Sequence, residues 1–216
     1  MESVAVLDYG SSNLRSVAKA LQFVADGDHQ VIVSSDPAEI LRADRIVFPG
    51  QGAIGDCMRS LTSCNLIDAI TEGIKTRPFL GICLGLQSLM SSSDEDSGTE
   101  CLDIFDGKVS HFRRNAGPGD DGSPRKIPHM GWNEVEWQKP HPLIAGIPSR
   151  SRFYFVHSYF VEPKAREIVM GETEYIDRFV SALASSNAFA TQFHPEKSAD
   201  AGLQLLENFL HWDGVP

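Results

Sequence analysis

The sequence lacks the features that mark secreted, membrane-spanning and nucleic-acid-binding proteins. It has only four cysteines in 216 residues, with no Cys-x-x-Cys pair, which is far below the density of a secreted disulfide scaffold. The most continuous apolar run, residues 79–86, is broken by glycines and is much shorter than the ~20 residues of a membrane span. Acidic residues outnumber basic ones, 29 to 19, so a broad surface for polyanions such as nucleic acid is not expected.

A targeting segment is also missing from the N-terminal residues. Positions 1–8 carry no basic stretch, and Glu2 precedes any apolar run of signal-peptide length. We therefore predict a first strand there and expect a cytoplasmic protein in a reducing compartment, where a reactive thiol stays usable.

What is present is an ordinary globular composition, 42% hydrophobic and 22% charged, which allows a substantial core. We expect one domain over residues 1–216. In the first half, strand-like runs at 4–7, 30–33, 45–48 and 78–82 alternate with helical patterns at 14–24, from 36, at 58–61, 66–75 and 84–90. This alternation predicts an α/β fold with parallel strands, helices on both faces, and a ligand site at the carboxyl ends of the strands.

The second half is richer in strands. Strand-like runs occur at 108–112, 132–137, 153–156, 168–171, 180–183 and 189–193, and an amphipathic helix is predicted over 200–212. Residues 115–125, rich in Gly, Pro and Asp, are predicted to form a mobile loop rather than a domain linker.

Cys83 is the strongest candidate for a nucleophile. It lies between a buried strand and a predicted helix, with Gly81 and Gly85 two residues away on either side, which is the cysteine form of a nucleophile elbow. Glycine removes side chains that would collide across such a strained turn, and the following helix favours the thiolate. A structural cysteine at a tight turn is the alternative. The other three cysteines have no such context and are expected to be inert.

His194 is the best candidate for the base that such a cysteine needs. It follows a predicted strand and precedes Pro195 and Glu196. In extended backbone, residues two apart project to the same side, so Glu196 can accept a hydrogen bond from the imidazole and fix its tautomer. A surface turn with a capping glutamate is the alternative. His157 is the main rival base but has no nearby carboxylate, and no His/Cys spacing predicts a metal site.

Three motifs in this order resemble those of the class I glutamine amidotransferases. They are an upstream Pro-Gly-x-Gly loop, a Gly-x-Cys-x-Gly-x-Gln elbow and a late His-Pro-Glu. Within that class, further runs resemble the HisH-type glutaminase subunits of imidazole glycerol phosphate synthase. These runs are Asp8-Tyr9-Gly10, Asn13-Leu14-Arg15-Ser16-Val17, Pro128-His129-Met130-Gly131-Trp132-Asn133, Tyr154-Phe155-Val156-His157-Ser158-Tyr159 and His194-Pro195-Glu196-Lys197-Ser198.

The resemblance implies a three-layer α/β/α, flavodoxin-like fold with a mostly parallel central sheet and an added antiparallel portion in the second half. It also implies that Cys83 attacks the glutamine side-chain amide, that His194 protonates the departing ammonia, and that water releases glutamate from a thioester, with no cofactor. The implied oxyanion donors are the backbone amides of Gln51 and Leu84. The implied substrate-binding residues are Gly50, Gly52, Gln87, Ser158 and Tyr159.

A partner is implied as well, because ammonia released into water is mostly protonated and no longer nucleophilic. By resemblance the partner is a HisF-type (β/α)₈ cyclase subunit in a heterodimer, and such a barrel of ~250 residues exceeds this whole chain. The interface residues implied are Asn13, Trp132, Tyr154 and Lys197.

Two features depart from the family's pattern. Gln51 replaces a small apolar residue, which could change how readily the oxyanion amide reorients, and Ser11-Ser12 replaces a more glycine-rich loop. Three other functions remain open at this point: an amidotransferase subunit of another pathway, a cysteine hydrolase acting on γ-glutamyl peptides, and a catalytically silent regulatory subunit.

Overall fold

The computed structural model describes residues 1–25, 27–112 and 126–215, so the predicted loop at 115–125 lies outside the described residues. The α-helices are α1 (Leu14–Val24), α2 (Pro37–Arg42), α3 (Ile54–Ser63), α4 (Ile67–Thr76), α5 (Leu84–Ser88) and α6 (Ala199–His211). The strands are β1 (Glu2–Leu7), β2 (His29–Ser34), β3 (Arg45–Gly50), β4 (Phe79–Cys83), β5 (Met90–Ser93), β6 (Thr99–Glu100), β7 (Phe105–His111), β8 (His129–Trp137), β9 (Ser151–His157), β10 (Tyr159–Pro163), β11 (Val169–Glu174), β12 (Arg178–Ser185) and β13 (Ala188–Thr191). Short 3₁₀ turns include one over Pro195–Lys197.

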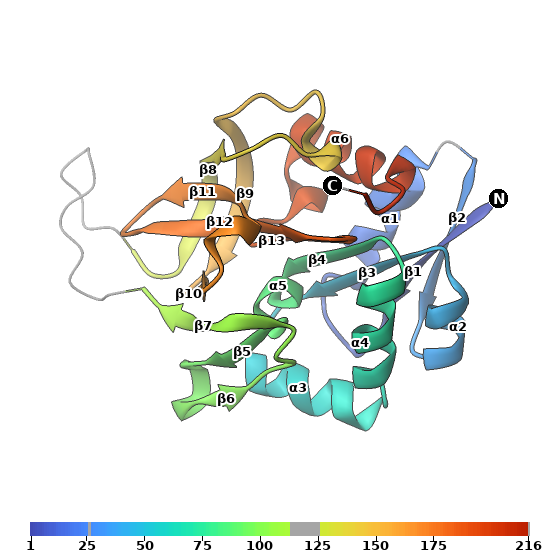
Figure 1. The fold of residues 1–216 in the computed structure, drawn as a ribbon, viewed down its shortest axis with the longest axis horizontal. Coiled ribbons are helices and arrows are strands. Elements are labelled where there is room, and N and C mark those ends of the chain that lie inside the picture. Colours follow the sequence, from blue (N-terminus) through green and yellow to red (C-terminus); the bar gives the residue numbers. More distant parts are fainter. Residues whose placement is uncertain (26, 113–125, 216) are drawn as a thin grey trace.

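Helices cover both faces of the sheet because successive side chains of each buried strand point to opposite sides. Val4 and Val6 of β1 pack in a hydrophobic cluster with residues of α1 and α6. Ala5 and Leu7 pack in a second cluster with residues of α2, α3 and α4. The chain therefore forms three layers, with α1 and α6 on one side of the sheet and α2, α3 and α4 on the other (Figure 1). This confirms the predicted α/β/α class.

The sheet has a parallel part and an antiparallel part. Strands β2, β1, β3, β4 and β13 lie side by side in that order and pair in parallel. Beyond β13, the pairs that β12 makes with β13, β10 and β11 are antiparallel, as are those of β8 with β9 and β11. Placing β13 next to β4 brings the ends of β3, β4 and β13 to one edge, where β3 leads into the Pro-Gly-x-Gly loop, β4 into the elbow and β13 into the His-Pro-Glu motif.

Two local predictions were wrong. The helix predicted over 84–90 ends at Ser88, and Met90 starts strand β5, which pairs in parallel with β7. Leu89 and Met90 are both fully buried, and a short apolar run does not by itself distinguish a buried helix from a buried strand. The strand predicted over 189–193 ends at Thr191.

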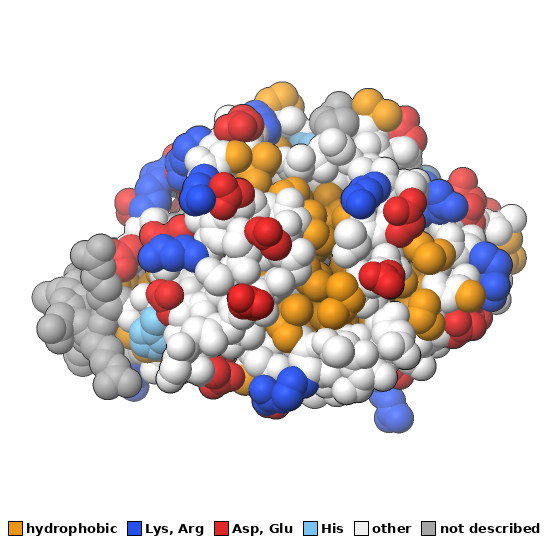
Figure 2. Space-filling model, turned by 60° about the horizontal axis from the view of Figure 1, so that its bottom comes forward, with side chains coloured by type: hydrophobic (Ala, Val, Ile, Leu, Met, Phe, Trp, Pro, Cys, Tyr) orange, Lys and Arg blue, Asp and Glu red, His pale blue; other side chains and the backbone are white. Residues whose placement is uncertain are grey.

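Charges of both signs are interspersed over the face shown in Figure 2, and hydrophobic side chains gather at its centre. This pattern agrees with the expectation from composition that no broad basic surface is present on that face. Among the described residues, no helix is long and apolar enough to cross a membrane.

Candidate active site

Cys83 occupies a strained turn at the end of β4. Its backbone has φ 55° and ψ −102°, a region that non-glycine residues rarely adopt. A Cβ on Gly85 would lie 2.0 Å from the Phe48 carbonyl oxygen, and one on Gly81 would lie 3.1 Å from the Ala190 Cβ. The two glycines therefore allow the elbow to pack against its neighbouring strands, as the sequence predicts.

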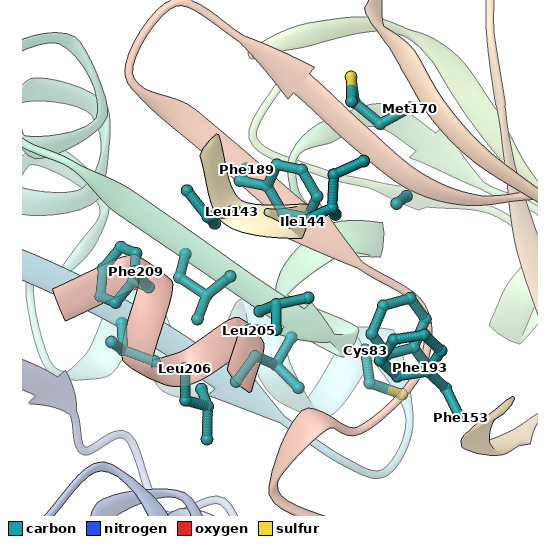
Figure 3. Packing of buried hydrophobic residues seen from close by; sticks show 14 of the residues in the cluster. Cys83, Leu143, Ile144, Phe153, Met170, Phe189, Phe193, Leu205, Leu206 and Phe209 are labelled. Carbon is teal, nitrogen blue, oxygen red and sulfur yellow. The ribbon is translucent and has the colours of Figure 1, made fainter. Parts of the chain in front are cut away.

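The side chain of Cys83 is buried in a hydrophobic cluster. Figure 3 shows it with Phe153 and Phe193, which belong to the same cluster. The three other cysteines are free thiols, and Cys57 is buried with its sulfur 3.5 Å from the Ser88 hydroxyl. Burial raises the pKa of the Cys57 thiol, which favours the unreactive protonated form.

Replacing Gly85 with alanine is expected to destabilise the fold by at least ~2 kcal/mol, because the new methyl group would clash with backbone that cannot move aside. Thermal and denaturant unfolding measure the loss. Gly55→Ala is the matched control, since a Cβ there meets mainly the ends of the flexible Asp96 and Arg59 side chains. Equal stability of the two variants would contradict the close approach of β3 to the elbow.

His194 and Glu196 form a buried pair. The Nδ1 atom of His194 lies 2.8 Å from Oε1 of Glu196, and neither side chain is exposed. The same oxygen accepts a hydrogen bond from Nδ2 of Asn13 at 3.3 Å. The contact was predicted, but its assumed backbone was wrong: Pro195–Lys197 is a 3₁₀ turn rather than extended chain.

Backbone contacts with β9 hold this turn in place. The amide of His194 donates to the Tyr154 carbonyl at 2.9 Å, and the Ser198 hydroxyl donates to the His194 carbonyl at 2.6 Å. The free ring nitrogen, Nε2, has no hydrogen-bond partner among the described residues. Burial alone lowers the pKa of His194, but the nearby Cys83 and Glu196 outweigh it and raise the pKa above its usual value. The imidazolium form of His194 is therefore favoured.

His157, the rival base, is occupied on both ring nitrogens. Its Nδ1 donates to the Tyr159 carbonyl at 2.8 Å, because a carbonyl only accepts, and its Nε2 then accepts from Nδ1 of His129 at 2.9 Å. Burial lowers the pKa of His157 to about 3, so the ring stays neutral. The pair supports a structural role for His157 and leaves His194 as the candidate base.

The Pro-Gly-x-Gly loop runs beside the nucleophile. Gly50 is the parallel partner of Cys83 in the sheet, and a Cβ there would lie 2.3 Å from the Tyr9 hydroxyl and 2.8 Å from the Leu84 Cβ. The Tyr9 hydroxyl donates to the Pro49 carbonyl at 2.8 Å. Gly52 has φ +104°, a conformation that favours glycine. The loop therefore needs both glycines where they stand.

A cavity of about 470 Å³ opens over the sulfur. Most of the predicted oxyanion and substrate residues line it: Gln51, Gly52, Leu84, Gln87, Ser158 and Tyr159. Gly50, the last residue of β3, does not line it. Glu95 and Pro128 also line the cavity and were not predicted from the sequence. Among the described residues, no group of three or more His, Cys, Asp or Glu could hold a metal ion.

Two of the four predicted interface residues, Tyr154 and Lys197, line this cavity, and a third, Trp132, packs against Tyr154. Trp132 is 44% exposed and its ring packs edge-on to Tyr154, with the centroids 6.2 Å apart. The Lys197 ammonium lies 6.0 Å from the centre of the Tyr154 ring. Asn13, in contrast, is only 3% exposed and contacts Glu196. Its amide is placed to orient the carboxylate, and its interface role stays a prediction.

Comparison with known proteins places this geometry in a family. The model for glutamine amidotransferase class-I matches residues 5–212. The chain belongs to the class I glutamine amidotransferase family. It is 52% identical to the imidazole glycerol phosphate synthase subunit HisH of Nitrosococcus oceani, over 100% of both chains. It is 53% identical to the subunit of the same name from Dechloromonas aromatica, over 98% of this chain and 97% of that one.

Solved amidotransferase structures share the fold. A glutamine amidotransferase from Thermotoga maritima superposes with a TM-score of 0.65 at 16% identity, over 97% of this chain and 83% of that one. At this identity the likeness concerns the fold alone. It agrees with the layered sheet of this class I glutamine amidotransferase.

Proposed function

We propose that the chain is the glutaminase subunit of imidazole glycerol phosphate synthase in histidine biosynthesis, and that it works in the cytoplasm. One observation carries the proposal: Cys83 and the His194–Glu196 pair follow the adjacent parallel strands β4 and β13, and Cys83 lines a cavity of about 470 Å³, which has room for glutamine. The near-complete match to subunits named HisH supports the choice of pathway.

Hydrolysis begins with the Cys83 thiolate attacking the side-chain amide carbon of glutamine. The oxyanion that forms accepts hydrogen bonds from the backbone amides of Leu84 and Gln51. Nε2–H of His194 gives its proton to the departing nitrogen, and ammonia leaves as the thioester forms. A water molecule then loses a proton to His194, attacks the thioester carbon and releases glutamate and the thiolate. Glu196 stabilises the imidazolium in each half of this cycle.

The ammonia passes to a HisF-type cyclase subunit in a heterodimer. Trp132, Tyr154 and Lys197 support this placement. Tyr154 and Lys197 line the cavity, and the exposed Trp132 packs against Tyr154, so the three side chains form a cluster suited to a partner surface. In the heterodimer, ammonia would pass from the glutaminase site to the synthase site without being released into water.

Glutamate formation measured with and without the cyclase barrel tests this function. The chain alone is expected to be weakly active. A HisF-type barrel with its nucleotide ligand is expected to raise the rate of glutamate formation roughly 50-fold, within the usual range of allosteric coupling. No rise with the ligand-bound barrel, under conditions where the two chains co-elute, would contradict the assignment.

An interface pair of variants sharpens this experiment. Trp132→Ala is expected to lower the affinity for the barrel at least ~10-fold, as for a tryptophan anchor, and so to reduce co-elution. Phe23→Ala is the matched control, since Phe23 is an aromatic on α1 that is 76% exposed and does not line the cavity. Equal loss from both variants would place the partner elsewhere.

A further inference from the structure

A side chain outside the predicted triad contacts the sulfur of Cys83. Nε2 of Gln192 lies 3.6 Å from Sγ, and Gln192 is completely buried. Gln192 lies between the end of β13 and His194, and its backbone N–H donates to the Ser181 carbonyl at 2.9 Å. None of the motifs discussed above assigns it a role.

The orientation of the Gln192 amide is fixed by a chain of hydrogen bonds that ends on backbone. Nε2 of Gln87 lies 2.9 Å from the Tyr159 carbonyl, which can only accept, so this atom of Gln87 must be the nitrogen. The same nitrogen lies 3.1 Å from Oε1 of Gln192 and donates its second hydrogen there. The other end of Gln192, the NH₂ group, therefore has to face the sulfur.

We propose that Gln192 is a further catalytic residue of the glutaminase, whose side-chain amide donates a hydrogen bond to Cys83 Sγ and stabilises the thiolate. The catalytic role rests on the proposed function, whereas the contact between Gln192 and the sulfur rests on the geometry alone. A hydrogen bond of this kind is stronger to a thiolate than to a thiol, because the sulfur is then charged. Gln192 therefore increases the fraction of the enzyme that carries the nucleophile in its reactive form.

The same contact acts when the thioester is hydrolysed. Water adds to the thioester carbon, the C–S bond breaks, and its electron pair leaves on sulfur as a thiolate that faces Nε2 of Gln192. Gln87 has both Nε2 hydrogens committed to Tyr159 and Gln192. Any contact from the Gln87 side chain to the substrate is therefore made by its Oε1 atom, as an acceptor.

Alkylation of Cys83 tests the proposal without glutamine or partner. Iodoacetamide reacts with the thiolate, and mass spectrometry of the Cys83 peptide separates it from the other three cysteines. In Gln192→Met, which keeps the length and loses the donor, the midpoint of the pH profile of alkylation is expected to move up by about one pH unit. The other titratable groups near the sulfur or in the cavity wall are unchanged in this variant. They are His194 with its partner Glu196, Tyr9, Glu95, Tyr154, His157, Tyr159 and Lys197.

Two further variants keep the test decisive. Thr191→Val removes a fully buried hydroxyl from the end of β13 that bonds the Phe193 carbonyl and not the sulfur, so its alkylation profile is expected to match the parent. Gln87→Leu removes the donor that orients Gln192, and it is expected to shift the alkylation profile in the same direction by a smaller amount. This variant provides the test if Gln192→Met does not fold. A profile of Gln192→Met identical to the parent would overturn the proposal, as would an equal shift in Thr191→Val. Absence of glutaminase activity in the parent would contradict the proposed function. The alkylation profiles would still test the contact between Gln192 and the sulfur, because they need neither glutamine nor a partner.

Discussion

Cys83→Ala is expected to lower partner-stimulated glutamate formation at least ~10⁴-fold, in the range seen when a covalent nucleophile is removed. The loss should appear in kcat, because alanine cannot form the thioester, whereas the cavity that binds glutamine keeps its other walls. Steady-state kinetics with the cyclase barrel and its ligand measure the effect, and mass spectrometry of the quenched enzyme should find the acyl adduct in the parent alone.

Cys64→Ala is the matched control for this substitution. Cys64 is a free, partly exposed thiol just after α3, outside the cavity lining, so its removal should leave the rate within twofold or so of the parent. Both variants are expected to co-elute with the barrel. Unchanged activity of Cys83→Ala would mean that glutamine hydrolysis uses a different nucleophile.

The turn at the candidate nucleophile Cys83 was predictable because its signals are local. Gly81 and Gly85 flank the turn that Cys83 makes; a Cβ at Gly85 would clash with the Phe48 carbonyl, and one at Gly81 would lie tightly against Ala190. The alternation of strands and helices predicted that the ends of parallel strands would meet at one edge. From these two facts, Cys83 and His194 could be expected to lie together.

The contacts that complete the site were not predictable in the same way, because they join residues far apart in the chain. Asn13 and Glu196 are 183 positions apart, and nothing in either motif indicates that the two side chains meet. The pairing of His129 with His157 likewise depends on the register of β8 against β9. Gln192 did carry a usable signal, since it stands two residues before His194 and near the end of a predicted strand.

The two departures from the family's sequence pattern turn out to be in contact. The Ser12 hydroxyl donates to Oε1 of Gln51 at 3.2 Å. The two residues that depart from the family's pattern are therefore hydrogen-bonded to each other. Sequence inspection treated them as separate features, because 39 positions lie between them. Their contact links the loop after β1 to the loop after β3, on the same side of the molecule as Asn13.

Glu196→Gln is expected to slow turnover by about 10³-fold, as when the charged orienter of a catalytic histidine is neutralised. Oε1 of Glu196 accepts from both His194 and Asn13, while its second oxygen has no partner among the described residues. A glutamine can therefore keep its amide oxygen toward His194 and place its NH₂ where the unpartnered oxygen was. The substitution removes charge while largely preserving geometry, so some thioester should still form.

The pH profile distinguishes this charge effect from a loss of packing. In the parent, burial lowers the pKa of His194, and the negative charges of Cys83 and Glu196 outweigh that effect and raise it. Without the charge of Glu196 the imidazolium loses its proton at lower pH, so the alkaline limb of kcat/KM should move to lower pH by about one unit. Glu207→Gln, at an exposed position on α6, is the control and should change neither rate nor profile. If Glu196→Gln were as fast as the parent, a group other than Glu196 would have to hold His194 in its catalytic orientation.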